Sequence, residues 1–355
     1  MQAIVDSDIE SELVTQVAAL VAAGGAVEIV GGGSKRFYGE PVEAMPLEVG
    51  GHSGIIDYDP AELVITLRSG CKLDEVEALL AQNRQMFGFE PPSFGAQATI
   101  GGMVASGLAG PRRAFAGSIR DFVLGARILD GNGEVLQFGG RVIKNVAGFD
   151  VSRLLVGSLG TLGVILEVSI RVVPIPETEV TLAFAHAQPA EHIRWINELG
   201  SEPLPISASS WNDGVSHLRL SGSEQGVKQA CGQLGGDAVE PQWDQLREQN
   251  HPFFAAEQPL TRLSLPPACD ELSPAVSQLV EWGGAQRWLC GEVDVAALRG
   301  EAEALGGSVC AFRNHSGGVP VFQPPAPLVM KLQRDIKASF DPQGIFNAGR
   351  LYPGI

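Results

Sequence analysis

Four glycine-rich stretches constrain this chain more than any other feature of its sequence. They are GGGSK at residues 31–35, ATIGGMVASG at 98–107, KNVAGFD at 144–150 and GSLGTLGVI at 157–165. Glycine makes up 44 of the 355 residues, well above the roughly 7% of ordinary proteins. Such a surplus indicates backbone that adopts conformations closed to other residues, or that approaches a ligand closely.

Charge and cysteine usage exclude several classes of protein. The chain has 25 Lys and Arg against 41 Asp and Glu and no cluster of basic residues, which argues against a nucleic-acid binder. Its five cysteines form no CxxC pair, so we expect neither a disulfide scaffold nor a metal site. The longest uncharged apolar stretch, residues 17–27, is about half the ~20 residues of a membrane helix. We therefore expect a cytoplasmic protein that reaches a membrane only through partners.

Hydrophobic periodicity predicts mixed helices and strands in the first half of the chain. A helix is expected over 7–24, with Ser7 and Glu10 as a capping box and Gly24 at its end. A short strand over 26–30 leads directly into the first glycine stretch. Further strands are predicted at 63–67, 124–129 and 134–138 and after the turn at 156, with a helix at 73–83.

The second half of the chain differs in composition: it contains all five tryptophans and fewer glycine-rich loops. Strands are predicted at 180–185, 206–210, 216–220, 261–265, 285–290 and 308–312, and helices at 189–199, 224–232, 272–282, 294–305 and 328–339. This order forms two approximate β-α-β units, which favour a small antiparallel sheet covered by helices on one face. The fold class is therefore α+β.

The first glycine stretch would suit an anion. Consecutive amides without bulky side chains can point at one oxyanion and form a nest for phosphate. The stretch is not a Rossmann fingerprint, because Arg36 occupies the position of the third glycine, and the chain has no Gly-Lys pair for a P-loop. An ordinary glycine turn would explain the stretch equally well.

The second stretch resembles the start of a helix. Thr99 would cap a helix that opens at Ile100, so that the amides of Gly101 and Gly102 face an anion. Close packing of the helix through small residues is the alternative.

Glycines recur at every third position in the last stretch. Gly157, Gly160 and Gly163 would let backbone lie flat along a planar ligand, or would form a series of tight turns.

The order of these stretches, followed by DPQGIFNAGR at 341–350, resembles the vanillyl-alcohol-oxidase/p-cresol-methylhydroxylase (PCMH) superfamily of flavoproteins. GGGSKRFYG, GSLGTLGVI and the tail FNAGRLYPG are most similar to the FAD-binding E subunits of bacterial glycolate oxidase. The resemblance implies a PCMH-type FAD-binding domain of two α+β subdomains over 1–176 and an α+β cap domain over 177–327. Residues 328–355 would form a C-terminal helix and tail that return to the FAD domain.

The resemblance also implies a set of FAD contacts. The first loop would hold the pyrophosphate and the second would line ribitol and pyrophosphate. The strand that starts at 164 would meet adenine or the ring edge, and the tail asparagine would approach the flavin ring. In that order the matching residues are Gly31, Gly32, Gly33, Ser34 and Lys35; Thr99, Gly101, Gly102, Ala105 and Ser106; Val164 and Ile165; and Asn347.

Three positions depart from the family pattern. Ser34 stands where members with a covalent flavin often have a histidine, so FAD is expected to bind noncovalently. Leu159 replaces the glutamate of the family's Gly-Ser-Glu-Gly and loses a polar contact, and Ala348 replaces the proline of Asn-Pro-Gly.

The sequence offers few residues that could bind a substrate or accept its proton. Oxidation of a 2-hydroxy acid by a flavin needs a base for the hydroxyl proton and a cation for the carboxylate. The histidine-rich metal motif of the related dehydrogenases is absent. Arg262, inside an apolar strand, is the best cation because a buried guanidinium demands an anion, although an internal salt bridge would satisfy it. The other candidates are Arg247, Arg287 and Arg313 as cations, and His251 or His315 as the base.

The leading hypothesis is a noncovalent FAD-binding subunit of a glycolate oxidase complex. In that family the subunit works beside a sister catalytic flavoprotein subunit and an iron–sulfur subunit, and the complex oxidises glycolate, a small 2-hydroxy acid, to glyoxylate. One alternative is a self-sufficient FAD-dependent 2-hydroxy-acid dehydrogenase. Another is a structural scaffold subunit with a vestigial flavin pocket.

Overall fold

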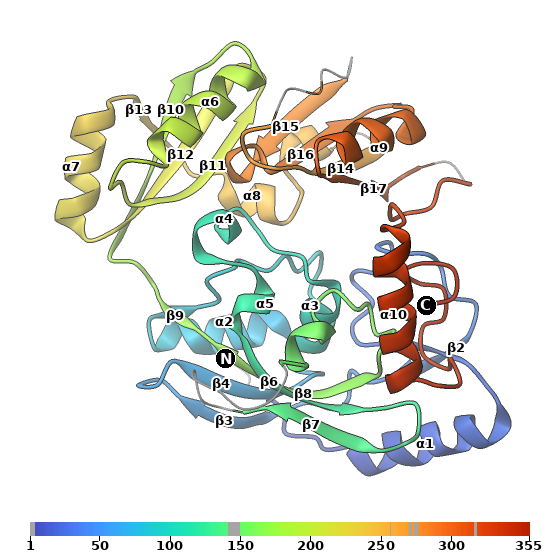
Figure 1. Cartoon of the computed structure of the whole chain (residues 1–355). Helices are drawn as coiled ribbons and strands as arrows, with labels where there is room; N and C mark the ends of the chain where they lie inside the picture. The colour runs from blue at the N-terminus through green and yellow to red at the C-terminus, as the bar shows by residue number, and fades with distance from the viewer. Residues whose placement is uncertain (1–3, 141–149, 256, 270–271, 273–275, 316–317) are drawn as a thin grey trace.

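Two antiparallel sheets, built from different halves of the chain, organise the molecule (Figure 1). The structure is a computed structural model that describes residues 4–140, 150–255, 257–269, 272, 276–315 and 318–355. The first sheet consists, in spatial order, of β3 (Ile55–Asp59), β4 (Val64–Arg68), β8 (Val164–Arg171), β6 (Val123–Leu129) and β7 (Val135–Gly139). The strands predicted at 63–67, 124–129 and 134–138 are thereby confirmed.

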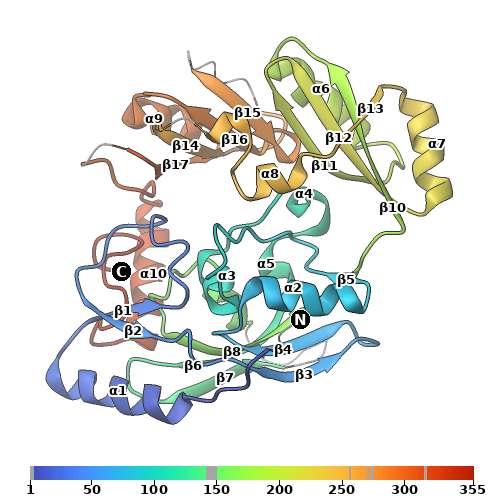
Figure 2. The same ribbon diagram turned by 180° about the vertical axis from the view of Figure 1, so that it is seen from behind.

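Three helices cover one face of this five-stranded sheet (Figures 1 and 2). They are α2 (Leu73–Gln82), α3 (Ile100–Ser106) and α5 (Ile119–Phe122). On α2 the apolar side chains of Leu73, Val76 and Leu80, three and four residues apart, are fully buried in the core against the sheet. The resulting core holds β4, β6 and β8 against the helices.

A smaller α+β unit lies beside this sheet. It contains α1 (Glu10–Ala23) and the parallel pair β1 (Val27–Val30) and β2 (Met45–Glu48). Gly24 ends the helix with φ 62°, as predicted. The predicted capping box is wrong, because Ser7 forms an extended bridge with Ser53 and the helix begins only at Glu10.

All the strands described in the second half join one large antiparallel sheet. In spatial order they are β13 (Asp237–Val239), β10 (Thr178–Ala185), β12 (Val215–Gly222), β11 (Ile206–Asn212), β15 (Ser277–Glu281), β16 (Gln286–Cys290), β14 (Leu260–Ser264) and β17 (Ser308–Arg313). The expected small sheet is thus wrong in size, because β11 pairs with β15 and joins the two predicted units.

The helix predicted over 272–282 is also wrong in the part that the structure describes. Residues 277–281 form the strand β15, which hydrogen-bonds to β11 on one side and to β16 on the other. Pairing on both sides places this segment inside the large sheet, so tertiary context overrides the local pattern.

The outer face of the large sheet is covered by α6 (Pro189–Leu199), α7 (Glu224–Leu234) and α9 (Val295–Ala304), each close to its predicted range. The inner face carries an aromatic cluster that packs against the first half of the chain. Trp243 and Trp288 belong to this cluster.

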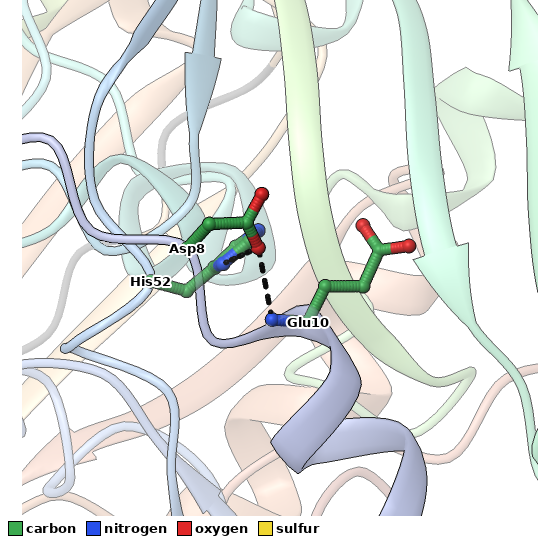
Figure 3. Close-up of side chains that lie close together, drawn as sticks. All are labelled: Asp8, Glu10 and His52. Atoms are coloured by element: carbon green, nitrogen blue, oxygen red, sulfur yellow. Dashed lines mark hydrogen bonds and ion pairs between the residues drawn. The ribbon is translucent and has the colours of Figure 1, made fainter.

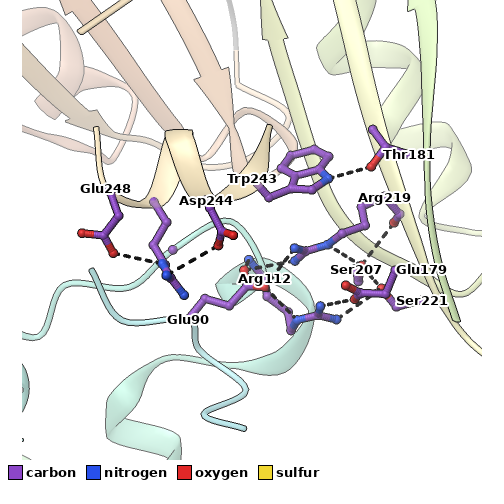
Figure 4. A network of polar contacts seen from close by, with 12 residues as sticks. Glu90, Arg112, Glu179, Thr181, Ser207, Arg219, Ser221, Trp243, Asp244 and Glu248 are labelled. Atoms are coloured by element: carbon purple, nitrogen blue, oxygen red, sulfur yellow. Dashed lines mark hydrogen bonds and ion pairs between the residues drawn. The ribbon is translucent and has the colours of Figure 1, made fainter. Parts of the chain in front are cut away.

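A buried ionic network fastens the two halves together (Figure 4). Glu90, from the first half, accepts hydrogen bonds from the Arg112 side chain at 3.2 Å and from Arg219 Nη2, on β12, at 3.0 Å. Arg112 also pairs with Glu179 at the start of β10. The Arg112 and Arg219 side chains are 8% and 5% exposed, so each buried cation has an anion beside it.

The C-terminal segment, α10 (Pro327–Phe340) and the tail, returns to the first half of the chain. Lys337 Nζ donates to the carbonyl oxygens of Thr161 and Phe346, at 2.7 and 2.8 Å, and forms an ion pair with Asp341 at 2.6 Å. The amide of Val27 donates to the tail carbonyl of Ile345 at 2.8 Å. The fold is therefore the predicted α+β arrangement with a returning C-terminal segment. Within the described residues, no helix combines the length and apolar character needed to cross a membrane.

Replacing Glu90 with glutamine is expected to lower the free energy of unfolding by about 3–5 kcal/mol, because the buried Arg219 guanidinium loses its anion and Arg112 keeps only Glu179. Burial acts to raise the pKa of Glu90, but Arg219 and Arg112 hold it below its ordinary 4.5. The stabilisation is then fully present above pH 4.5 and is lost as the pH falls through the lowered value. Urea denaturation over a range of pH measures both effects.

Asp6→Asn is the matched control, because this carboxylate pairs with Arg68 but is 79% exposed. Its loss should stay within about 1 kcal/mol. Equal losses in the two variants would contradict the role of the network.

Candidate functional site

A groove opens where the first glycine stretch, α3, the turn at Leu159 and the C-terminal tail meet. It contains about 530 Å³ of free space, part of it open to solvent. The predicted contact residues that line it are Gly31, Gly32, Gly33, Ser34, Lys35, Thr99, Gly102, Ala105, Ser106 and Asn347. The structure thus brings together residues from three separate stretches of the sequence.

The glycine loop requires its glycines because it runs against another backbone segment. A Cβ atom at Gly32 would lie 1.3 Å from the carbonyl oxygen of Gln97, and one at Gly31 would lie 2.5 Å from Thr99 Oγ1. In the described part of the chain, no backbone or side-chain acceptor takes a hydrogen bond from the amides of residues 31–35. These consecutive donors therefore form a nest that an anionic ligand can occupy.

The N-terminus of α3 does not bind an anion in the way the sequence suggests. Thr99 caps the helix as predicted, but its Oγ1 accepts the amide of Gly102 at 3.2 Å. The amide of Gly101 donates to the carbonyl of Ser69 at 2.7 Å. Gly101 lies outside the groove, and a Cβ atom there would come within 2.7 Å of Ser69 Cβ. Close packing, the alternative interpretation, explains this glycine.

The regularly spaced glycines form tight turns that pack on α3. Gly157 and Gly160 have φ values of 79° and 76°, and the amide of Leu159 donates to the carbonyl of Ala105 at 2.9 Å. Val164 and Ile165 begin β8 and are buried in the core, so the structure does not bring them to the groove. Of the KNVAGFD stretch, residues 144–149 lie outside the described residues.

Asn347 connects three segments at the floor of the groove. Its Oδ1 accepts the amide of Ile29 at 2.7 Å, and its Nδ2 donates to the carbonyl of Leu159 at 2.5 Å. The side chain is buried and both of its polar atoms are used. Asn347 thus sets the distance between the strand before the glycine loop, the turn and the tail.

Lys35 supplies a cation at the end of the nest. Its Nζ donates to the carbonyl of Ser93 at 3.1 Å and lies 3.4 Å from Ser34 Oγ. Burial lowers the pKa of this ammonium to about 8, against the opposing effect of Glu248. The group is therefore still protonated at neutral pH and can balance the charge of a phosphate.

A second set of charged groups borders the groove and was missed from the sequence. Glu28, on β1, pairs with Arg36 and lies 3.6 Å from Arg350 Nη1. Arg350 also donates to the carbonyl oxygens of Arg36 and Tyr38, at 3.2 and 3.3 Å. The available signal was a glutamate inside the otherwise apolar strand 26–30.

The candidate substrate residues do not converge. His251 accepts the amide of Phe253 at Nδ1 and contacts Gln242 at Nε2, so both ring nitrogens are engaged. Arg247 pairs with carboxylates, including Glu248, and Arg313 donates to Gln249.

The remaining two candidates are also placed by local contacts. Arg287 donates to the carbonyl of Gly284, and His315 lies against the carbonyl of Leu260. These contacts do not bring a candidate base next to a candidate cation.

Arg262 departs from the simpler interpretation. Its Nη2 donates to the hydroxyl of Tyr38 at 2.8 Å, and no carboxylate among the described residues forms an ion pair with it. The expected internal salt bridge is therefore wrong in the described part of the chain.

One group of potential metal ligands, Asp8, Glu10 and His52, lies outside the groove lining, and its members already have other partners (Figure 3). Asp8 accepts the amide of Glu10 at 3.0 Å and pairs with Arg68, and Glu10 pairs with Arg127. His52 Nδ1 accepts a backbone amide at 3.3 Å. These contacts leave little lone-pair capacity for a metal ion.

Comparison with known proteins shows which proteins this chain resembles. Residues 1–139 match the family described as an FAD binding domain, which shows FAD as the cofactor. The chain is 43% identical over 348 residues to the glycolate oxidase subunit GlcE of Escherichia coli strain K12, covering 98% of each chain. It is 37% identical over 129 residues to the glycolate oxidase subunit GlcD of Bacillus subtilis strain 168, covering 36% of this chain and 27% of that protein.

A solved structure shares the fold. An alkyldihydroxyacetonephosphate synthase superposes with a TM-score of 0.66 at 14% identity, covering 94% of this chain and 74% of that one. At this identity the likeness concerns the fold alone.

Replacing Lys35 with methionine is expected to weaken FAD binding by roughly 10-fold or more, because a charge-assisted contact to phosphate is lost. The protonated ammonium binds the anion, so wild-type affinity should hold below pH 8 and fall as the pH rises above it. Affinity of the variant should change little over the same range. Fluorescence titration of the protein with FAD between pH 6.5 and 9.5 measures both.

Lys228→Met, on the exposed face of α7, is the control and should keep the wild-type affinity and pH profile. If the Lys35→Met variant kept the wild-type pH profile, Lys35 would not be the group that binds the FAD phosphate.

Proposed function

The chain belongs to the family of the glycolate oxidase subunit GlcE, and from this premise we propose that it is the noncovalent FAD-binding subunit of a glycolate-oxidising complex. In the proposed complex, a sister catalytic flavoprotein and an iron–sulfur subunit act beside it, and glycolate is oxidised to glyoxylate. The location would be the cytoplasm, with attachment to the inner face of the membrane through partners.

The groove supports a dinucleotide with two phosphates. The amides of residues 31–35 would bind the pyrophosphate, with the Lys35 ammonium as its counter-charge. Ala105 and Ser106 on α3 would lie along the ribitol. When bound, FAD supplies the capacity to accept a hydride or electrons, while these residues hold and orient it.

Noncovalent attachment is supported by the lining of the groove. Ser34 occupies the position where a histidine would bond to the flavin, and the described lining of the groove contains no histidine or cysteine. A hydroxyl at this position has no comparable tendency to form a bond with the ring.

The observation that supports the proposal most strongly is the nest of unpartnered amides beside a partly buried ammonium. These donors lie in a groove that is partly open to solvent, and consecutive amides without a partner in the described residues suit an anion. A scaffold with a vestigial pocket would have no reason to keep them open.

Filling the groove is expected to remove the cofactor without unfolding the chain. Ala105 lies on α3 and faces the groove, and leucine is as compatible with a helix as alanine. Overpacking costs about 1–3 kcal/mol, so Ala105→Leu should lower FAD affinity by roughly 5- to 150-fold. The flavin absorption of the purified protein and the glycolate-oxidising activity of the whole complex are the two measurements.

Ala19→Leu, on the exposed side of α1, makes the same change far from the groove and should retain the flavin. A complex that remains fully active after Ala105→Leu has removed the flavin would favour the scaffold.

The isolated chain is expected to keep its flavin oxidised when glycolate or D-lactate is added without oxygen. The reason is that no histidine is in the described lining of the groove, and both nitrogens of His251 are engaged. Anaerobic flavin absorption measures this. Rapid bleaching by the isolated chain would favour the self-sufficient dehydrogenase instead.

A further inference from the structure

An exposed apolar stripe lies on α10, at the outer edge of the molecule (Figure 1). Leu328, Val329 and Leu332 are 70%, 44% and 52% exposed. Leu328 and Leu332 are four residues apart, so they lie one above the other on the same face of the helix. Single exposed apolar side chains are common in proteins, whereas a contiguous group of them indicates contact with another molecule.

The stripe continues into an apolar groove. Ile336, four residues after Leu332, lines a groove of about 210 Å³ between α10, the turn at 157–162 and the tail. The other apolar side chains of its wall are Leu154, Val156, Leu162, Leu351 and Ile355. Sites for small molecules usually have volumes of about 300–1,000 Å³. This groove is smaller and partly open to solvent, so it suits side chains of a partner protein better than a complete ligand.

Basic side chains border the other flank of the stripe. Lys331 and Arg334 lie three residues apart on the exposed side of α10, and neither forms an ion pair in the part of the chain that the structure describes. Asp335 is the only carboxylate in the sequence of this helix. The whole chain has a net charge of −16, so the local excess of positive charge is opposite in sign to the charge of the molecule. A partner that complements this flank is acidic.

The stripe has a fixed position relative to the cofactor groove. Lys337, on the buried side of α10, donates to the carbonyl of Thr161 in the turn at 2.7 Å. The same turn contributes Leu159 to the cofactor groove, and Thr161 and Leu162 to the apolar groove. A partner bound along α10 would therefore contact the turn that borders the proposed flavin site.

We propose that the stripe and the apolar groove, together called the α10 surface, bind an amphipathic helix of another subunit of the complex, whose apolar face is flanked by carboxylates. Leu328, Leu332 and Ile336 follow one another at intervals of four residues, the spacing with which one helix packs along another. The carboxylates of the partner would pair with Lys331 and Arg334. That the partner is a subunit of the complex rests on the proposed function, whereas its apolar and acidic character rests on the α10 surface alone.

Two other occupants fit the α10 surface less well. A two-fold dimer of this chain would place the surface against itself, and the surface has two unpaired cations for one carboxylate. A membrane attracts apolar side chains that are flanked by cations. Anionic lipids would nevertheless repel a chain with a net charge of −16, and a lipid surface offers no side chains of defined shape to fill the groove.

Surface plasmon resonance on the FAD-loaded full chain tests the α10 surface, with the purified sister flavoprotein and iron–sulfur subunits added separately and together. We expect the wild-type chain to bind. Leu332→Glu should bind at least about 10-fold more weakly, because the substitution places a charge in an apolar contact. Met45→Glu, on β2, is the matched control, since this apolar side chain is 75% exposed and lies outside the α10 surface. It should bind normally.

Charge reversal tests the acidic character of the partner. The double variant Lys331→Glu and Arg334→Glu should bind roughly 10-fold more weakly at low ionic strength, and wild-type affinity should fall as salt is added. The double variant Arg194→Glu and Lys228→Glu, on α6 and α7, changes the net charge by the same amount and is the matched control. Equal losses in the two double variants would assign the effect to net charge and overturn the acidic partner.

Thermal unfolding of each variant separates a docking role from a structural one. Glutamate has nearly the helix propensity of leucine, and the position is exposed, so Leu332→Glu should keep the wild-type unfolding midpoint. If Leu332→Glu is destabilised, Leu328→Glu decides, because this side chain is still more exposed. Wild-type affinity of a folded glutamate variant for both subunits would overturn the α10 surface.

The competing occupants give different results. Sedimentation of the isolated wild-type chain as a dimer, with Leu332→Glu as a monomer, would identify a second copy of the chain as the occupant. Wild-type binding to vesicles of phosphatidylcholine and phosphatidylglycerol that Leu332→Glu abolishes would identify a membrane. Either result would overturn the proposed partner helix.

Flavin content and wild-type assembly, measured on the same samples, keep the two proposals distinct. All variants should retain FAD, because none of the substituted residues lines the cofactor groove. If the wild-type chain and the glutamate variants assemble equally well, the α10 surface is wrong and the FAD-binding subunit stands. A wild-type chain that binds neither subunit contradicts the proposed complex, and the docking of a partner subunit fails with it.

Discussion

The two hydrogen bonds of the Asn347 side chain hold the cofactor groove in shape. They tie the tail to β1 and to the turn at Leu159, over sequence separations of 318 and 188 residues. The glycine loop follows β1 directly, so its position depends on this connection. Lys337 adds to the same junction from α10 through two carbonyl groups and Asp341. A groove built from such distant segments forms only when the C-terminal segment has docked.

Buried polar groups in this chain fall into two kinds. Glu90, Asn347 and Lys337 are satisfied by neighbours, and each of them joins segments that the sequence separates. Others lack a partner among the described residues: several buried side-chain atoms, such as Arg262 Nε, and the half-buried or exposed amides of residues 31–35. The amides differ from the isolated atoms because consecutive donors can converge on one anion.

Sequence patterns predicted the elements well where local signals and tertiary context agree. The local pattern of the helix at 189–199 was sufficient. At 277–281 they disagree, because pairing with β11 and β16 decides the structure. In the site, Gly32 and Asn347 were identified by their motifs. Glu28 was missed because no motif contains it, and Arg350 was missed because the tail motif that contains it gave it no role. Gly101 was assigned to the anion site, but Ser69 takes its amide.

The sequence by itself determined the class of the protein, because the order of its glycine stretches resembles that of the PCMH flavoprotein superfamily. Each stretch is a local requirement for bare backbone and can therefore be read from the sequence. Only the tertiary structure decided which amides remain open and which buried cations lack an anion. Both depend on partners brought from elsewhere in the chain, such as Ser69 for Gly101 and Tyr38 for Arg262. Local sequence contains no record of these partners, since long-range packing selects them.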